Sequence, residues 1–128
     1  MARQRVSSGG PWEARFGYSR VAVAGDMAFV AGTTDAGPEG QSLHPGDPAG
    51  QARAVFGIIE RALEQAGFGL ADGVRTRMFV TDAAHIAPIA AVHGEVFRDV
   101  RPASSAVVVA ALIDPSLLVE IEADARRS

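Results

Sequence analysis

The sequence predicts an α+β fold in which one mixed sheet carries two helices packed on one of its faces. Two segments, 48–66 and 86–97, repeat apolar residues at helical spacing. Others, among them 118–125, alternate apolar and polar residues as half-buried strands do. No Gly/Pro-rich stretch is long enough to divide the 128 residues into two folding units, so we expect a single domain over 1–128.

Two short strands open the predicted sheet. Residues 20–24 and 27–31 flank Gly25-Asp26, and a two-residue connection of this kind is typical of a β-hairpin. A loop rich in glycine and proline follows at 37–48. This loop is either a plain connector or a flap over a binding site.

Helical periodicity then predicts two helices. Asp47 can cap the first helix, Pro48 suits its first turn, and Gly67 ends it. Its apolar stripe is made by Ala52, Val55, Ile59, Ala62, Leu63 and Ala66. The second helix covers about 86–97, and Pro102 stops the chain from continuing it.

Three further strands complete the sheet. Residues 73–81 alternate, with Phe79 on the same face as two arginines. Residues 118–125 alternate more regularly still, with apolar side chains on one face and carboxylates on the other. Residues 106–112 are almost wholly apolar and rich in β-branched side chains, so we expect a buried strand there.

The second face of this sheet predicts self-association. Two helices on one side leave the other side uncovered, and that side carries apolar residues such as Phe29, Val107 or Val109. An apolar face left open to water is typical of proteins that bind copies of themselves.

Composition excludes several classes of function. Twelve Lys and Arg against 15 Asp and Glu give a net charge of -3, which argues against a nucleic-acid partner bound by phosphate neutralisation. The chain has no cysteine, so disulfides, thiolate nucleophiles and cysteine-ligated zinc are excluded. No apolar run approaches the roughly 20 residues of a membrane span, and residues 1–10 lack the apolar segment of a signal peptide. We therefore expect a cytoplasmic protein with no membrane partner.

Three carboxylates share one face of the last predicted strand: Glu120, Glu122 and Asp124. Neighbours at i and i+2 lie about 6.5–7 Å apart, so their charges repel and burial would raise their pKa values. A carboxyl group in that condition can act as a general acid or base. For Glu122 and Asp124 the alternative is pairing with Arg75 and Arg77, which have the same spacing on another strand.

The other polar and aromatic candidates give weaker signals. The histidines match no metal-binding template and are expected at solvated or helix-surface positions: His44, His85 and His93. Ser104-Ser105 lies in no motif that would make either serine a nucleophile. Aromatic side chains gather near the N-terminus, where they either pin an arm or form the wall of a small pocket: Trp12, Phe16 and Tyr18.

Taken together, these segments resemble the Rid family, also called YjgF-like or L-PSP endoribonuclease-like. Arg101-Pro102-Ala103 and the segment 119–123, Val-Glu-Ile-Glu-Ala, resemble its C-terminal signature. Further segments resemble its aromatic entry, a strand end, a helix start and its central strand, and they lie at 16–18, 29–33, 51–53 and 75–82. The resemblance runs from about residue 10 to residue 125.

This resemblance implies a chorismate-mutase-like fold and a homotrimer with a central barrel-like core. Three ligand clefts would lie between subunits, each built from residues of two neighbours. In the deaminase branch, an arginine directly after Pro-Ala binds a substrate carboxylate, a glutamate matching Glu120 helps to activate water, and a tyrosine matching Tyr18 lines the cleft. Those members hydrolyse reactive imines and enamines such as 2-aminoacrylate without a cofactor or metal.

The chain departs from that pattern at Ser104, which stands where the arginine would be. Serine carries no positive charge, so the usual carboxylate clamp is missing and the substrate would be uncharged or bulkier. Arg20, Arg75 or Arg77 would have to supply a charge from elsewhere. The resemblance therefore indicates a branch of the family that lacks the carboxylate-binding arginine.

Three functions follow from these observations, in decreasing order of support. The first is an imine or enamine hydrolase, similar to a deaminase, that uses Glu120 and a small-molecule metabolite. Its binding residues would be Tyr18, Thr33, Ser104, Arg20 and Phe79. The second is a non-catalytic trimer that binds a metabolite in the same cleft, and the third is an endoribonuclease, which the acidic balance disfavours.

Overall fold

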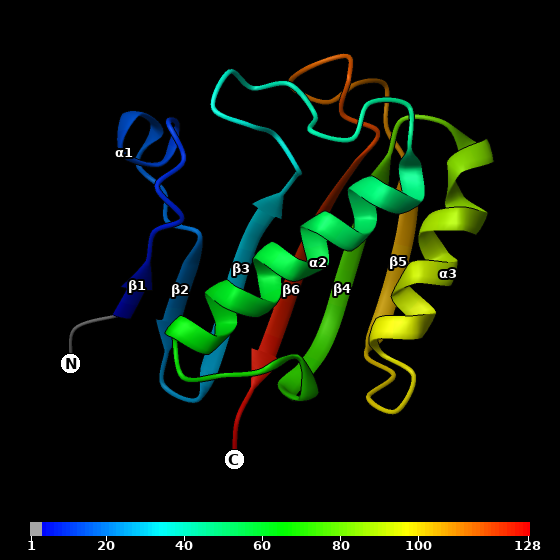
Figure 1. The fold of residues 1–128 in the computed structure, drawn as a ribbon. Helices are drawn as coiled ribbons and strands as arrows, with labels where there is room; N and C mark the ends of the chain where they lie inside the picture. The colour runs from blue at the N-terminus through cyan, green and yellow to red at the C-terminus, as the bar shows by residue number, and fades with distance from the viewer. Residues whose placement is uncertain (1–3) are drawn as a thin grey trace.

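The computed structural model describes residues 4–128, in which six strands form one sheet of order β1-β2-β3-β6-β4-β5 (Figure 1). The strands are β1 (Gln4–Val6), β2 (Val21–Ala24), β3 (Met27–Thr33), β4 (Gly73–Val80), β5 (Ala103–Val108) and β6 (Val119–Arg126). Strands β4 and β5 run parallel, and every other neighbouring pair is antiparallel. Strand β6 therefore lies in the middle of the sheet, between β3 and β4.

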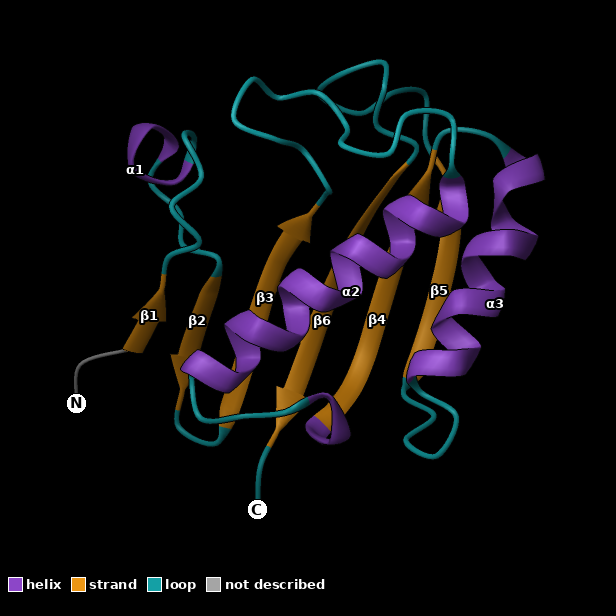
Figure 2. Ribbon diagram, viewed as in Figure 1, coloured by secondary structure: helices purple, strands orange, loops and turns teal. Residues whose placement is uncertain are grey.

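Two long helices, α2 (Pro48–Gln65) and α3 (Ile86–Val96), lie on the same face of the sheet (Figure 2). A short helix, α1 (Glu13–Phe16), lies beyond the start of β2, and single 3-10 turns cover 70–72 and 83–85. The core forms between the helices and the sheet, and its fully buried members include Val21, Ile59, Leu63, Val80, Ile89 and Ile121. The predicted α+β architecture, with both helices on one face, is confirmed.

Helix α2 begins and ends as the sequence predicts. The Asp47 side chain accepts a hydrogen bond from the Gly50 amide at 2.9 Å, and Pro48 occupies the first turn. Gly67 follows the helix with φ of +85°, a left-handed conformation that favours glycine. The apolar stripe of the helix is buried against the sheet.

A buried glutamine joins the start of α2 to the loop before β6. The Gln51 Nε2 donates to the carbonyl oxygens of His44 at 3.1 Å and Ser116 at 3.0 Å. Its Oε1 accepts from the Leu118 amide at 2.8 Å. All three partners are backbone groups, so this one side chain links the helix to two loops that are distant in sequence.

The strand predicted as buried over 106–112 is placed differently by the structure. Strand β5 spans Ala103–Val108, lies at the edge of the sheet, and exposes every one of its residues. Val107 and Val108 keep 45% and 51% of their surface exposed. The prediction of burial is wrong for the isolated chain. An apolar run indicates that a strand packs against other residues, but it does not indicate whether those residues belong to the same chain or to another one.

The sequence did not predict strand β1 or helix α1. Both are too short for periodicity to reveal, at three and four residues. In the part of the chain that the structure describes, no helix is long and apolar enough to cross a lipid bilayer.

Candidate functional site

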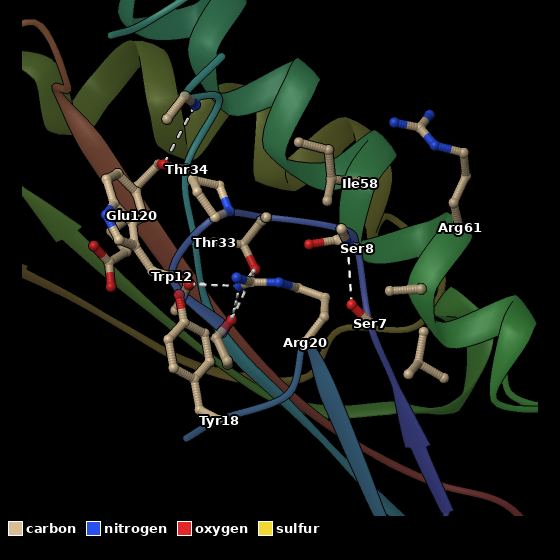
Figure 3. A pocket seen from close by; sticks show the side chains of 18 of the residues that line it. Ser7, Ser8, Trp12, Tyr18, Arg20, Thr33, Thr34, Ile58, Arg61 and Glu120 are labelled. Carbon is tan, nitrogen blue, oxygen red and sulfur yellow. Dashed lines mark hydrogen bonds between the residues drawn. The ribbon is translucent and has the colours of Figure 1, made fainter. Parts of the chain in front are cut away.

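A cavity of about 1010 Å³ opens where β2 begins and β3 ends. On one side lies the loop 6–12, on another the loop 34–38, and residues of α2 close the far end. Figure 3 shows Tyr18, Arg20, Thr33 and Glu120 gathered in this cavity, with Trp12 beside them. The structure therefore brings together four of the predicted site residues, although they come from segments up to a hundred positions apart.

Two predicted site residues lie outside the lining of this cavity. Phe79 stands opposite Glu120 in the β4–β6 pairing, so it shares the open face of the sheet with the glutamate. Ser104 stands opposite Thr76 in the β4–β5 pairing, on the face that the helices cover. In a single chain, Ser104 and Glu120 therefore lie on opposite faces of the sheet.

Glu120 is half-buried in the cavity, and its environment raises the pKa of its carboxyl group. Burial is the main cause, because it disfavours the charged form, and the negative charge of Glu122 adds to it. The positive charge of Arg20 acts in the opposite direction. The outcome is a carboxyl group that keeps its proton to a higher pH than an exposed glutamate does.

The Glu120 carboxyl group rests against Gly32 in β3. A Cβ atom at position 32 would overlap Glu120 Oε2 and would lie only 3.0 Å from its Cδ. An alanine at position 32 would therefore displace the Glu120 carboxyl group from its present place against the backbone. This contact could not be read from the sequence, where Gly32 appears only as the end of a strand.

Arg20 is a buried cation, with 8% of its surface exposed. Its Nη1 donates to the Gly32 carbonyl at 2.6 Å and to Thr33 Oγ1 at 2.9 Å, and Nη2 lies 4.0 Å from the Glu13 carboxylate. The guanidinium also lies 5.8 Å from the centre of the Tyr18 ring. The guanidinium donors of Arg20 that could bind a substrate carboxylate are therefore already engaged by groups of the protein itself.

Thr33 is buried as well, and its hydroxyl donates to the Ala31 carbonyl at 2.7 Å while accepting from Arg20. Tyr18 is the more accessible side chain, with 39% of its surface exposed. Trp12 and Tyr18 both line the cavity, so the pocket-wall interpretation of the N-terminal aromatic residues holds for these two. Phe16 instead is mostly exposed.

The remaining carboxylates of β6 both pair with Arg77, which is one of the two arginines that the alternative interpretation names. Arg77 Nη1 lies 3.6 Å from Glu122 Oε1 and 3.6 Å from Asp124 Oδ2. Arg75 stands opposite Asp124 in the strand pairing and is exposed. Glu120 faces Phe79 across the strands and has no arginine opposite it, which distinguishes it from its two neighbours.

A polar chain that the sequence did not reveal joins Ser104 to a histidine. Thr76 Oγ1 donates to Ser104 Oγ at 2.7 Å and lies 2.8 Å from His93 Nε2. The imidazole packs against Phe56 and Phe97, and burial lowers the pKa of His93. The expectation of a solvated or helix-surface position is therefore wrong for His93, because this half-buried residue lies on the side of α3 that faces β4.

His44 and His85 keep part of their surface exposed. His44 Nδ1 lies 3.0 Å from the buried Asp35 carboxylate, with the imidazole partly exposed. Over residues 4–128, no group of three or more His, Cys, Asp and Glu side chains is arranged to hold a metal ion.

Because ionising Glu120 is unfavourable in the folded protein, Glu120→Gln is expected to raise the free energy of unfolding at neutral pH. The folded-state pKa lies above the ordinary value of 4.5, so the contribution of Glu120 to stability is complete below that pH and is lost as pH rises through the folded-state pKa. Urea unfolding between about pH 4 and about pH 8 should show the advantage of the variant growing with pH. Glu122→Gln, which loses the contact with Arg77, should show no such gain.

Comparison with known proteins places this geometry in one family. The family model described as endoribonuclease L-PSP matches residues 11–127. The uncharacterised protein SCO2049 of Streptomyces coelicolor is 38% identical over 127 residues, which cover 98% of this chain and 93% of that protein.

Solved structures agree with this assignment. Rv2704 from Mycobacterium tuberculosis, a member of the YjgF/YER057c/UK114 family, superimposes with a TM-score of 0.89 at 47% identity, covering 98% of this chain and 100% of that one. The YjgF gene product of E. coli superimposes with a TM-score of 0.83 at 30% identity, covering 99% and 100%. The chain therefore belongs to the endoribonuclease L-PSP family, which is the YjgF or Rid family.

Proposed function

We propose that this protein is a hydrolase of imines, enamines or related reactive metabolites, in which Glu120 activates water. The observation that carries the proposal is the raised pKa of Glu120 inside the cavity, next to Tyr18 and the Gly32 backbone. A carboxyl group whose pKa lies closer to neutral can both accept and return a proton within one reaction cycle.

The proposed reaction needs only water and one proton shuttle. The Glu120 carboxylate takes a proton from water as the water oxygen bonds to the imine carbon, and it passes a proton to the imine nitrogen. The C–N bond of the resulting carbinolamine then breaks as its hydroxyl proton moves to nitrogen, which leaves a carbonyl compound and ammonia. Glu120 is regenerated, so no cofactor is consumed.

The charges around Glu120 favour a substrate without a carboxylate beside the imine carbon. Ser104 is neutral, and the Arg20 donors are directed to Gly32, Thr33 and Glu13. Trp12 and Tyr18 instead supply aromatic surface to the cavity. We therefore propose an uncharged or bulkier imine in place of 2-aminoacrylate.

Restoring the charge is expected to change this preference. Ser104→Arg should raise kcat/KM for 2-aminoacrylate, generated in situ, by at least about tenfold, because a charge-assisted hydrogen bond contributes roughly 1.5–3 kcal/mol. Ammonia release would be compared with that of the original protein on a neutral imine and on 2-aminoacrylate. An unchanged ratio between the two substrates would contradict a role for position 104 in reading the substrate charge.

We also propose that the protein assembles as a homotrimer, with ligand clefts where subunits meet and Ser104 supplied by the neighbour. Exposed apolar side chains on the uncovered face, Phe29 and Val107, support the assembly, as does the fully exposed edge strand β5. The opposite-face positions of Ser104 and Glu120 in one chain are compatible with a cleft that takes them from two chains.

Charge on that face should therefore break the assembly. Val107→Glu is expected to convert a trimer into a monomer in light scattering at micromolar concentration, because burying an unpaired carboxylate costs several kcal/mol per site. Val74→Glu, at a valine of similar exposure within the register shift at the start of β4, serves as the matched control. A monomeric original protein would contradict the trimer and the shared cleft.

A second candidate, a non-catalytic trimer that binds a metabolite, is favoured by the loss of the arginine at position 104. A panel of imines distinguishes the two functions. Saturable metabolite binding without ammonia release from any imine would support binding alone. Endoribonuclease activity is the least supported function, because the net charge of -3 does not favour binding of a phosphate backbone.

A further inference from the structure

We propose that Arg20 is a positioning residue for Glu120: it holds the Gly32 carbonyl, and so fixes the backbone against which the Glu120 carboxyl group rests. The inference rests on the proposed role of Glu120. It assigns to Arg20 a function other than binding the substrate.

The backbone of β3 is irregular where it passes Glu120. Val30 pairs with Ala123, but Thr33 pairs with Ile121, so β3 advances by three residues while β6 advances by two. The extra residue makes a β-bulge that includes Gly32. A bulge leaves backbone groups without their regular hydrogen bonds to the neighbouring strand, and it bends the strand that contains it. This segment of β3 therefore needs other hydrogen-bond partners to fix its conformation.

Arg20 supplies those partners from the residue before β2. Its Nη1 donates to the Gly32 carbonyl at 2.6 Å, with longer contact to the Ala31 carbonyl at 3.4 Å and a bond to Thr33 Oγ1 at 2.9 Å. These three residues are the ones around the bulge. A planar guanidinium presents its donors in a fixed arrangement, which a lysine ammonium cannot reproduce.

The charge of Arg20 is balanced on the side away from the bulge. The Glu13 carboxylate lies 4.0 Å from Nη2 and is almost fully buried. Burial raises the pKa of Glu13, but hydrogen bonds from Ser8 and Ser7 and the charge of Arg20 together bring it below its usual value. Glu13 is therefore a stable anionic partner that keeps Arg20 in place.

Gly32 carries this constraint to Glu120. Its Cα lies so close to the Glu120 side chain that a Cβ would overlap Oε2 and lie 3.3 Å from Cγ. The groups that act on the Glu120 carboxyl are thus Gly32 by contact, Phe79 opposite it on β4, Glu122 on its own strand, and Arg20 by charge. If the bulge moves, the carboxyl group loses the surface that keeps it half-buried.

Substitutions separate positioning from simple electrostatics, because the two predict different changes in the pKa of Glu120. Arg20→Lys keeps the charge and loses the hold on Gly32, so the carboxyl group should become more solvated and its pKa should fall by at least about half a unit. Gly32→Ala should have the same effect while leaving Arg20 intact, because the new methyl group displaces the carboxyl group. A purely electrostatic role predicts no change in Arg20→Lys.

The measurement is a pH titration of the Glu120 side-chain carboxyl by carbon-13 NMR, with Glu120→Gln used to assign the signal. Arg61→Lys is the matched control, since Arg61 lines the same cavity from α2 and lies on the far side from Glu120 in Figure 3. Circular dichroism verifies that each variant is folded. If Arg20→Lys weakens the fold, Gly32→Ala provides the same test from the other side of the contact.

Folded Arg20→Lys and Gly32→Ala proteins in which Glu120 titrates as in the original protein would overturn the proposal. Turnover provides a separate measurement. A positioning role predicts that Arg20→Lys lowers kcat with little change in KM, whereas a residue that binds the substrate would raise KM. Absence of turnover on every imine would refute the proposed hydrolase, and the titration would still decide whether Arg20 positions Glu120.

Discussion

Replacing Glu120 with glutamine is expected to lower kcat for imine hydrolysis by about 10²–10⁴-fold, the usual contribution of a general acid–base group. The amide keeps the size of the side chain and its contact with Gly32 but neither takes a proton from water nor returns one. Initial rates of ammonia release, measured across pH, provide the test. In the original protein, kcat/KM should fall on the acid side with an apparent pKa above the ordinary glutamate value, because burial raises the pKa of Glu120.

Glu122→Gln is the control for this substitution. Glu122 lies on the same strand face but contacts Arg77, so its loss should change the rate by less than about tenfold. Comparable losses in the two variants would show that the strand's total negative charge matters and that Glu120 has no special role. Unchanged turnover in Glu120→Gln would remove the proposed mechanism altogether.

The largest effect on stability is expected at Gln51. Gln51→Ala leaves the Leu118 amide and the carbonyls of His44 and Ser116 without the side chain that satisfies them. At roughly 1–3 kcal/mol for each buried group left unpaired, with water reaching some of them, we expect a loss of about 3 kcal/mol. Urea unfolding gives the free energy directly.

Gln65 offers a matched comparison on the same helix. Its side chain is exposed at the last position of α2, so Gln65→Ala should change the free energy of unfolding by no more than about 0.5 kcal/mol. Equal losses at the two positions would mean that the hydrogen bonds of Gln51 contribute no more than helix propensity does. Gln51 would then matter for reasons other than joining the helix to the loops.

Much of the fold could be predicted because it follows from local periodicity. The ends of α2 and the alternation of β6 depend on neighbouring residues, and both are confirmed. The placement of β5 could not be predicted, because an apolar strand has the same pattern whether its own chain or another covers it. The expectation of a homotrimer came from the resemblance to the family, because no local sequence pattern indicates the number of subunits.

The sequence grouped several residues that the structure places in one cavity, but it did not reveal the contacts between them. Glu120, Tyr18 and Arg20 do share a cavity. The contact between Arg20 and Gly32 depends on a register shift between β3 and β6, which are separated by most of the chain. The chain from Ser104 through Thr76 to His93 likewise joins residues on three different elements. Such contacts arise from strand pairing, for which a single sequence contains no periodic signal.

The central place of β6 has a consequence for biosynthesis. The ribosome makes β1 to β3 and then β4 and β5, but these two groups have no direct edge in common, because β6 separates β3 from β4. Before β6 has emerged from the ribosome, β1 to β3 and β4 to β5 are therefore two separate parts of the sheet, and the edges of β3 and β4 that pair with β6 are unpaired. We expect the sheet to be completed only once β6 has left the ribosome, because until then the facing edges of β3 and β4 are unpaired.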